Sequence, residues 1–312
     1  MIELFKKTIS NFKERFHETN EKKLIIQSKI LSEKNKNKKN LENLSDVEYS
    51  VFSQWGEDGI IDWLVSQKIQ INDYFIEFGT GDYKESNTRY LLQNNNWSGS
   101  LIEGNKNDYD KIVNWKKRWR YDINIKNEFI TKKNINDLIR GFNPPNNIGL
   151  LSIDIDGNDY WILKELDLKE LNPSIIVAEY NSLFGDKHKI TVPYDENFDR
   201  SKKSHTNLYF GCSIQALINL CEEKKYFFIG TNKNGCNAFF VNEIFYENLN
   251  KKINNKKIFL SKFTESRNQE KKLSFLKRKD QLDLVKDLEV FDIEINKTKK
   301  ISEYNNLKDV EN

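Results

Sequence analysis

The chain has 312 residues, 50 of them Lys or Arg and 47 Asp or Glu. This length suits one large α/β domain with appended segments, and a net charge of only +3 argues against a protein built mainly to bind nucleic acid. The three cysteines lack zinc-binding spacing, no apolar run is long enough to span a membrane, and the N-terminus has no apolar centre of a signal peptide, so we expect a soluble cytoplasmic protein.

The N-terminal segment, residues 1–48, predicts a helical extension. Its apolar residues recur at helical spacing, at Ile2, Leu4, Phe5, Ile9, Phe12 and Phe16. This stripe could pack on the main domain, join a second subunit in a homo-oligomer, or lie on a membrane surface. Acidic residues are mixed with the lysines, which makes the membrane the weakest of the three.

A second predicted helix begins after the run Ser53-Gln-Trp-Gly-Glu-Asp58 and carries apolar residues from Ile60 to Val65. Asp58 or a neighbouring residue is expected to cap this helix. The alternative is that Gln54 and the two acids form a lid over a ligand, which we favour slightly.

The run from Asp73 to Asp82 predicts a buried strand that is followed by a glycine loop. Tyr74–Phe78 is apolar except for Glu77, and Gly79 and Gly81 follow at once. Such glycines let the backbone turn tightly and approach a ligand closely. Glu77 is costly to bury without a partner, and a ligand amine or ribose hydroxyl would serve as one.

Two further strands are predicted to end in acids. Gly99–Glu103 ends about twenty residues after the glycines, a spacing that suits an acid bound to a ribose. Gly149–Gly157 ends in Asp154, Asp156 and a glycine. Between the first two strands, Asn87 stands at the start of a helix whose amides would face the ligand. Its side chain could bond the ligand or merely cap the helix.

Together these motifs resemble FkbM-type S-adenosylmethionine-dependent methyltransferases over about residues 50–245. The resemblance implies a Rossmann-like methyltransferase fold that often acts on sugar hydroxyls, with S-adenosylmethionine as cofactor. The residues that we expect to bind it are Gln54, Glu77, Gly79, Thr80, Gly81, Asn87, Glu103 and Asp154.

A further predicted strand, Pro173–Glu179, ends beside Asn181. Oxygen ligands at two neighbouring strand ends suit Mg²⁺ or Mn²⁺, so Asp154, Glu179 and Asn181 are candidate metal ligands. The alternative is a hydrogen-bonded acidic cluster that lines a polar cleft. In either case Asp154 and Asp156 are candidate catalytic residues.

Residues 183–208 lack long apolar runs and are expected to form a substrate loop. His188 and His205 lie in this segment, and either could act as the general base.

Lys225–Ile229 and Ala238–Val241 predict a closing antiparallel hairpin, which a nicotinamide-binding fold lacks. We therefore expect a mostly parallel seven-stranded sheet in a methyltransferase domain, residues 49–245, followed by a charged helical extension, residues 246–312. The predicted function is an O-methyltransferase for a hydroxyl of a small molecule, sugar or polysaccharide precursor. The alternatives are a non-catalytic scaffold that keeps the fold and a nicotinamide-dependent enzyme.

Overall fold

The computed structural model describes residues 2–69, 72–305 and 307, and its centre is a seven-stranded sheet with the order β4-β3-β2-β5-β6-β9-β8. Strands β4 to β6 pair in parallel, whereas β9 runs antiparallel to both β6 and β8. The predicted fold and its closing hairpin are therefore confirmed. The strands are β2 (Asn72–Phe78), β3 (Ser98–Ile102), β4 (Ile123–Lys126), β5 (Ile148–Ile153), β6 (Ile175–Glu179), β8 (Tyr226–Thr231) and β9 (Asn237–Asn242).

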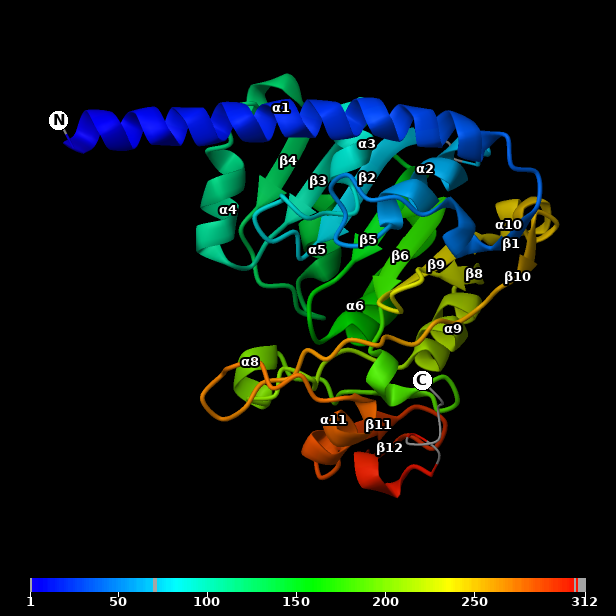
Figure 1. The fold of residues 1–312 in the computed structure, drawn as a ribbon. Coiled ribbons are helices and arrows are strands. Elements are labelled where there is room, and N and C mark those ends of the chain that lie inside the picture. The colour runs from blue at the N-terminus through cyan, green and yellow to red at the C-terminus, as the bar shows by residue number, and fades with distance from the viewer. Residues whose placement is uncertain (1, 70–71, 306, 308–312) are drawn as a thin grey trace.

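Helices cover both faces of this sheet, and each face has its own apolar cluster (Figure 1). Successive residues of a strand point to opposite faces, so Phe75 joins one cluster and Ile76 joins the other. The helices are α2 (Glu57–Ser66), α3 (Arg89–Asn94), α4 (Lys106–Val113), α5 (Ile135–Arg140), α6 (Asp159–Glu165), α7 (Leu168–Leu171), α9 (Ile214–Glu223) and α10 (Glu243–Asn250).

The N-terminal segment forms one long helix, α1 (Ile2–Lys36), which crosses the top of the domain and extends past the sheet beside α4 (Figure 1). The chain then enters the domain earlier than expected. Leu41 lies in strand β1 (Leu41–Asn43), Leu44 begins the 3-10 helix η1 (Leu44–Val47), and both are buried with Val47 in the apolar cluster of α2. The extension therefore ends before residue 41 rather than at residue 48.

The C-terminal segment is not the charged helix that we expected. After β10 (Ile253–Asn255), only α11 (Arg278–Val285) is α-helical among the described residues, and β11 (Glu289–Asp292) forms a small sheet with β12 (Lys297–Lys300) and β7 (Ile190–Thr191). The sparse apolar residues of this segment meet partners from another part of the chain. Leu282, Val285 and Val290 are buried against Phe184 and Val192, so a third small core forms below the sheet.

The remaining short elements connect these parts: the 3-10 helices η2 (Arg118–Arg120), η3 (Ser182–Phe184) and η4 (Ile301–Glu303), and the helix α8 (Arg200–Lys203).

Candidate active site

The glycine loop after β2 passes directly against the end of β5. Gly79 has φ 72°, and a Cβ atom added to it would lie 1.6 Å from the carbonyl oxygen of Asp154. Gly81 has φ 51°, and an added Cβ would meet nothing within 4 Å, because this glycine borders open space. The first glycine is therefore needed for the close approach of two strand ends, and the second leaves the backbone open to a ligand.

Glu77 is buried, and its carboxylate organises this loop. It accepts hydrogen bonds from the Ser86 hydroxyl (2.6 Å), the Asn87 amide N–H (2.9 Å) and the Thr88 hydroxyl. Burial raises the pKa of Glu77, and these donors oppose that rise by stabilising the carboxylate. The partner that we expected a ligand to supply is thus provided by the protein.

Two neighbouring cavities lie along this loop. The first, of about 480 Å³, is lined by seven of the eight predicted cofactor residues, which are Gln54, Glu77, Gly79, Thr80, Gly81, Asn87 and Asp154. The buried hydroxyl of Thr80 has no hydrogen-bond partner in the part of the chain that the structure describes, and Asn87 donates its amide to the Ser152 hydroxyl (3.1 Å). This cavity therefore offers polar groups to an amino-acid moiety.

The second cavity, of about 520 Å³, lies beyond Gly81 and contains Glu103. The Glu103 carboxylate accepts the N–H groups of Gly81 and Asn105, both at 2.7 Å, so it joins the glycine loop to the end of β3. Apolar walls come from Ile102, Phe129 and Ile130. An acid at the entrance of an apolar slot suits a ribose followed by a purine ring, so the two cavities fit the parts of S-adenosylmethionine.

A carboxylate cluster stands where the cavities meet. One oxygen from each of Asp154, Asp156 and Glu179 lies within 4.8 Å of the others. Burial and the mutual repulsion of the acids raise the pKa of Asp154 and of Glu179 well above the usual range. The structure thus brings together three of the predicted site acids, two from the end of β5 and one from the end of β6.

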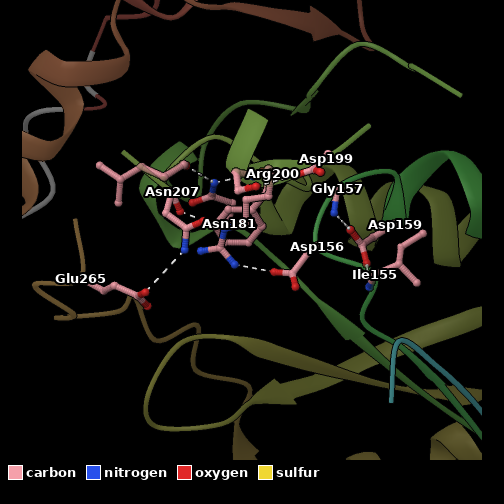
Figure 2. Close-up of polar contacts among 12 residues, drawn as sticks. Ile155, Asp156, Gly157, Asp159, Asn181, Asp199, Arg200, Asn207 and Glu265 are labelled. Carbon is pink, nitrogen blue, oxygen red and sulfur yellow. Dashed lines mark hydrogen bonds and ion pairs between the residues drawn. The ribbon is translucent and has the colours of Figure 1, made fainter. Parts of the chain in front are cut away.

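The cluster contains a cation that we did not predict from the sequence. Arg200, at the start of α8, pairs with Asp156, donates from Nε to the Asn207 carbonyl (2.8 Å) and lies over the Phe210 ring at 3.6 Å (Figure 2). Its charge lowers the pKa of Asp154 and of Glu179, against the larger effect of burial. In the sequence, only its position within the expected substrate loop, residues 183–208, pointed to Arg200.

Asn181 lines the site but does not join the acids as a ligand. Its side-chain oxygen accepts the Leu183 N–H (3.0 Å), and its nitrogen donates to the carbonyls of Leu208 and Phe210, both at 3.0 Å. All of the hydrogen-bonding atoms of the side chain are used to hold the loop. The side chain of Asn181, a predicted metal ligand, is therefore engaged by the loop, whereas Asp156 places a carboxylate oxygen within 4.8 Å of Asp154 and Glu179.

The structure does not bring the predicted histidines to the cluster. His188 packs its ring against Tyr304, its Nε2 lies 3.0 Å from the Asn305 carbonyl oxygen, and it lines none of the cavities described here. His205 is exposed in a turn. The reason is that β11 pairs with β7 and draws this part of the loop into the small C-terminal sheet.

A third cavity, of about 630 Å³, adjoins Gly79 and Asp154 on the side away from Glu103. Its wall includes residues that the sequence analysis missed, because they come from segments far apart in the chain. Trp55 stacks on Phe263 with 4.6 Å between ring centroids. Polar groups come from Gln54, Glu179, Asn237, Glu265, Arg278 and Gln281.

The turn before α2 is held rigidly rather than shaped as a free lid. Asp58 accepts the N–H groups of Val51 (2.7 Å), Phe52 (2.6 Å) and Ser53 (2.9 Å). Glu57 accepts from the side-chain amides of two asparagines, Asn232 (2.7 Å) and Asn237 (2.9 Å). These acids therefore fix the turn, and Gln54 and Trp55 line the cavities as parts of a static wall.

Comparison with known proteins connects this geometry to a family. Residues 63–199 match the model of the methyltransferase FkbM domain, which covers the glycine loop, the acids at the ends of β3, β5 and β6, and the segment up to Asp199. A search of curated proteins finds no match. Within the described residues, no helix is both long and apolar enough to cross a membrane.

Solved structures of methyltransferases are among those that share similarity with the chain. The N-terminal domain of EvdMO1 with S-adenosylhomocysteine bound has 9% identity and a TM-score of 0.39, over 61% of this chain and 81% of that one. An O-methyltransferase from Bacillus cereus in complex with S-adenosylhomocysteine has 14% identity and a TM-score of 0.37, over 57% and 77%. The family match and the fold show an S-adenosylmethionine-dependent methyltransferase in which residues 63–199 match an FkbM-type domain.

Proposed function

We propose that the protein transfers a methyl group to a hydroxyl group of a carbohydrate or of a carbohydrate precursor. The observation that carries this proposal is the cavity of about 630 Å³, which adjoins the cofactor cavities at Gly79 and Asp154. An acceptor in this cavity would lie beside the carboxylates of Asp154 and Glu179. When bound, S-adenosylmethionine supplies a methyl group on a positively charged sulfur, which a hydroxyl oxygen can attack.

In this proposal Asp154 or Glu179 removes the proton of the attacking hydroxyl. Their pKa values are raised by burial, so their carboxylates are stronger bases than ordinary ones. Two such close carboxylates hold one proton between them more readily than none. The Arg200 guanidinium, paired with Asp156, keeps negative charge at the cluster and favours an ionised base.

The wall of the acceptor cavity supports a carbohydrate substrate. The stacked pair of Trp55 and Phe263 offers an aromatic surface, which suits the C–H face of a sugar ring. Within the described part of the chain, the amide oxygen of Asn237 and the Nε–H of Arg278 are buried without hydrogen-bond partners, so they offer an acceptor and a donor for hydroxyl groups. A cavity that combines one apolar surface with several hydrogen-bonding groups is typical of sites for polar ring-shaped ligands.

A divalent cation at the same acids is a second candidate for the activation of the hydroxyl. The observation in its favour is that Asp154, Asp156 and Glu179 each place an oxygen within 4.8 Å of the others. Mg²⁺ or Mn²⁺ would use such oxygens and would lower the pKa of a bound hydroxyl. Because Arg200 already pairs with Asp156, we propose the metal-free base as the first choice.

The test combines an activity screen with chelation. The purified full-length chain is incubated with S-adenosylmethionine and a panel of monosaccharides, sugar nucleotides and non-carbohydrate phenols, and formation of S-adenosylhomocysteine is measured. We expect turnover with one sugar class, an O-methyl signal in the product by NMR, and unchanged turnover after EDTA. Turnover with phenols alone would contradict the proposal that the methyl acceptor is a carbohydrate. Activity that is lost in EDTA and restored by Mg²⁺ or Mn²⁺ would establish the metal instead.

A further inference from the structure

Helix α1 has two opposite sides with different chemistry. Successive residues of an α-helix are rotated by about 100°, which puts Phe5, Phe12, Ile26 and Ile30 on one side. These four side chains are 67%, 70%, 63% and 70% exposed. They span 25 residues, roughly 37 Å along the helix. A large exposed apolar strip of this kind marks an interaction surface.

The opposite side of α1 is bound to the methyltransferase domain. Ser28 contacts the Tyr90 hydroxyl (3.0 Å) and Asn35 donates to the Val47 carbonyl (3.0 Å). Glu21 pairs with Arg89 at 2.7 Å. These contacts fix the rotation of the helix, so the apolar strip points away from the domain. The strip is therefore not available to the core of its own chain.

Charges are sorted around the strip. Arg15, Lys22 and Lys29 are exposed at seven-residue spacing along one edge, and Lys23 lies within the strip. The acids Glu18 and Glu21 face the domain, where they pair with Lys117 and Arg89. Glu33, which follows the strip, pairs with Lys36 at 3.4 Å. Of the acids whose side chains are described, Glu18 and Glu21 are thus turned away from the apolar strip.

A basic, aromatic turn lies beside the same helix. Lys117 contacts Glu18 of α1 at 3.2 Å, and η2 begins at the next residue. Trp119 in this turn is 79% exposed, with the Arg120 guanidinium over its ring at 5.3 Å. Tryptophan next to arginine is a common anchor at a membrane–water interface. The turn therefore places a second exposed pair of an aromatic and a basic residue near α1.

From these observations we propose that α1 lies on an anionic lipid surface and holds the enzyme there. An amphipathic helix with aromatic residues on one side and basic residues beside them binds in the plane of such a surface. A second copy of the helix fits less well, because the described residues at the edge of the strip are basic and two copies would bring like charges together. The inference does not depend on the identity of the methyl acceptor.

The experiment measures co-sedimentation of the full-length chain with lipid vesicles. We expect binding to vesicles of phosphatidylcholine mixed with phosphatidylglycerol, weakening as salt is added, and little binding to phosphatidylcholine alone. The double variant Phe12→Glu with Ile26→Glu should bind at least about tenfold more weakly. The matched control, Phe275→Glu with Ile244→Glu, changes two residues that are each 67% exposed elsewhere and should bind normally.

A second pair of variants tests the charges. Lys22→Glu with Lys29→Glu should lose about tenfold in affinity for the anionic vesicles, whereas Lys279→Glu with Lys286→Glu, a pair with the same spacing at α11, should not. Each variant is checked by its melting curve and by binding of S-adenosylhomocysteine. If a strip variant does not fold, Trp119→Ser replaces it and should also weaken binding.

Three outcomes would overturn the proposal. The first is that the wild-type chain binds neither kind of vesicle. The second is that the control variants lose as much binding as the strip variants. The third is that light scattering shows a dimer that the variant Phe12→Glu with Ile26→Glu converts to monomer, while vesicles bind neither form. This last result would assign the strip to a second copy of the chain.

Discussion

The cofactor side and the acceptor side of the active site are built in different ways. Much of the cofactor side comes from residues close in sequence, from Glu77 to Glu103, and the carboxylates of these two residues accept hydrogen bonds from the protein. The proposed acceptor side combines Trp55, Asn237 and Phe263 from distant segments. A carboxyl oxygen of Glu179 and the amide oxygen of Asn237 are buried there without hydrogen-bond partners among the described residues. We therefore propose that the cofactor site is preorganised, whereas the acceptor site keeps polar groups for its substrate.

The largest effect that we expect tests the acids at the junction of the two sides. Asp154→Asn removes the proposed base and should lower kcat by about 10²–10⁴-fold. His188→Ala is the matched control, because His188 packs against Tyr304 away from the cavities. Loss of activity in the histidine variant and not in the aspartate variant would reverse our assignment of the base.

The next prediction compares two glycines of the same loop. Gly79→Ala would place its Cβ 1.6 Å from the Asp154 carbonyl oxygen, and we expect a loss of about 3–4 kcal/mol in the free energy of unfolding. Gly81→Ala meets no atom within 4 Å and should cost only about 1 kcal/mol, from its left-handed backbone. Chemical denaturation measures both, and equal losses would show that the close approach is relaxed in solution.

Glu103 tests how far the cofactor side is preorganised. Glu103→Ala removes the acceptor for the Gly81 and Asn105 amides and a carboxylate for the ribose, so cofactor binding should weaken by about 1–3 kcal/mol. Glu103→Gln keeps one acceptor oxygen and should have a smaller effect. Calorimetry with S-adenosylhomocysteine measures both variants. Unchanged affinity in the alanine variant would remove Glu103 from the cofactor site.

The pH dependence of kcat tests the role of Arg200 on the acceptor side. The base must be ionised, so kcat should rise with pH through the raised pKa of the coupled pair Asp154 and Glu179. The Arg200 charge lowers those pKa values. Arg200→Gln should therefore move the rising limb of the profile to higher pH, and Arg200→Lys should move it less. If the rising limb of kcat stays at the same pH in Arg200→Gln, the Arg200 charge does not act on the pKa of the base.

The smallest effect concerns the contact between α1 and the cofactor loop. Arg89 donates to the carbonyls of Tyr83 (3.1 Å) and Lys84 (3.2 Å) and to the carboxylate of Glu21 (2.7 Å). Glu21→Gln should loosen this link and weaken S-adenosylhomocysteine binding by about 0.5–1 kcal/mol. Glu18→Gln, whose partner is Lys117 instead, should leave the affinity unchanged. Equal losses of affinity in the two variants would mean that α1 affects cofactor binding through its packing on the domain as a whole and not through the pair of Glu21 and Arg89.

The sequence by itself determined the strands, the glycine loop and the acids Glu77, Glu103, Asp154, Asp156 and Glu179. These features are local: a buried strand needs a continuous apolar run, and parallel strands place their ends at one edge of the sheet. The mostly parallel seven-stranded sheet and its closing hairpin followed from the same patterns, together with the family resemblance.

Only the tertiary structure decided which side chains complete the site. Arg200 reaches Asp156, Phe263 meets Trp55, and His188 is drawn away by the pairing of β7 with β11, because each contact joins segments that no local periodicity relates. The same holds for α1. Its sequence mixes acids with lysines, and only docking of one side on Arg89 and Val47 turns two of the described acids away from the apolar strip. Composition reports which charges are present, whereas their arrangement depends on the rotation at which a helix packs.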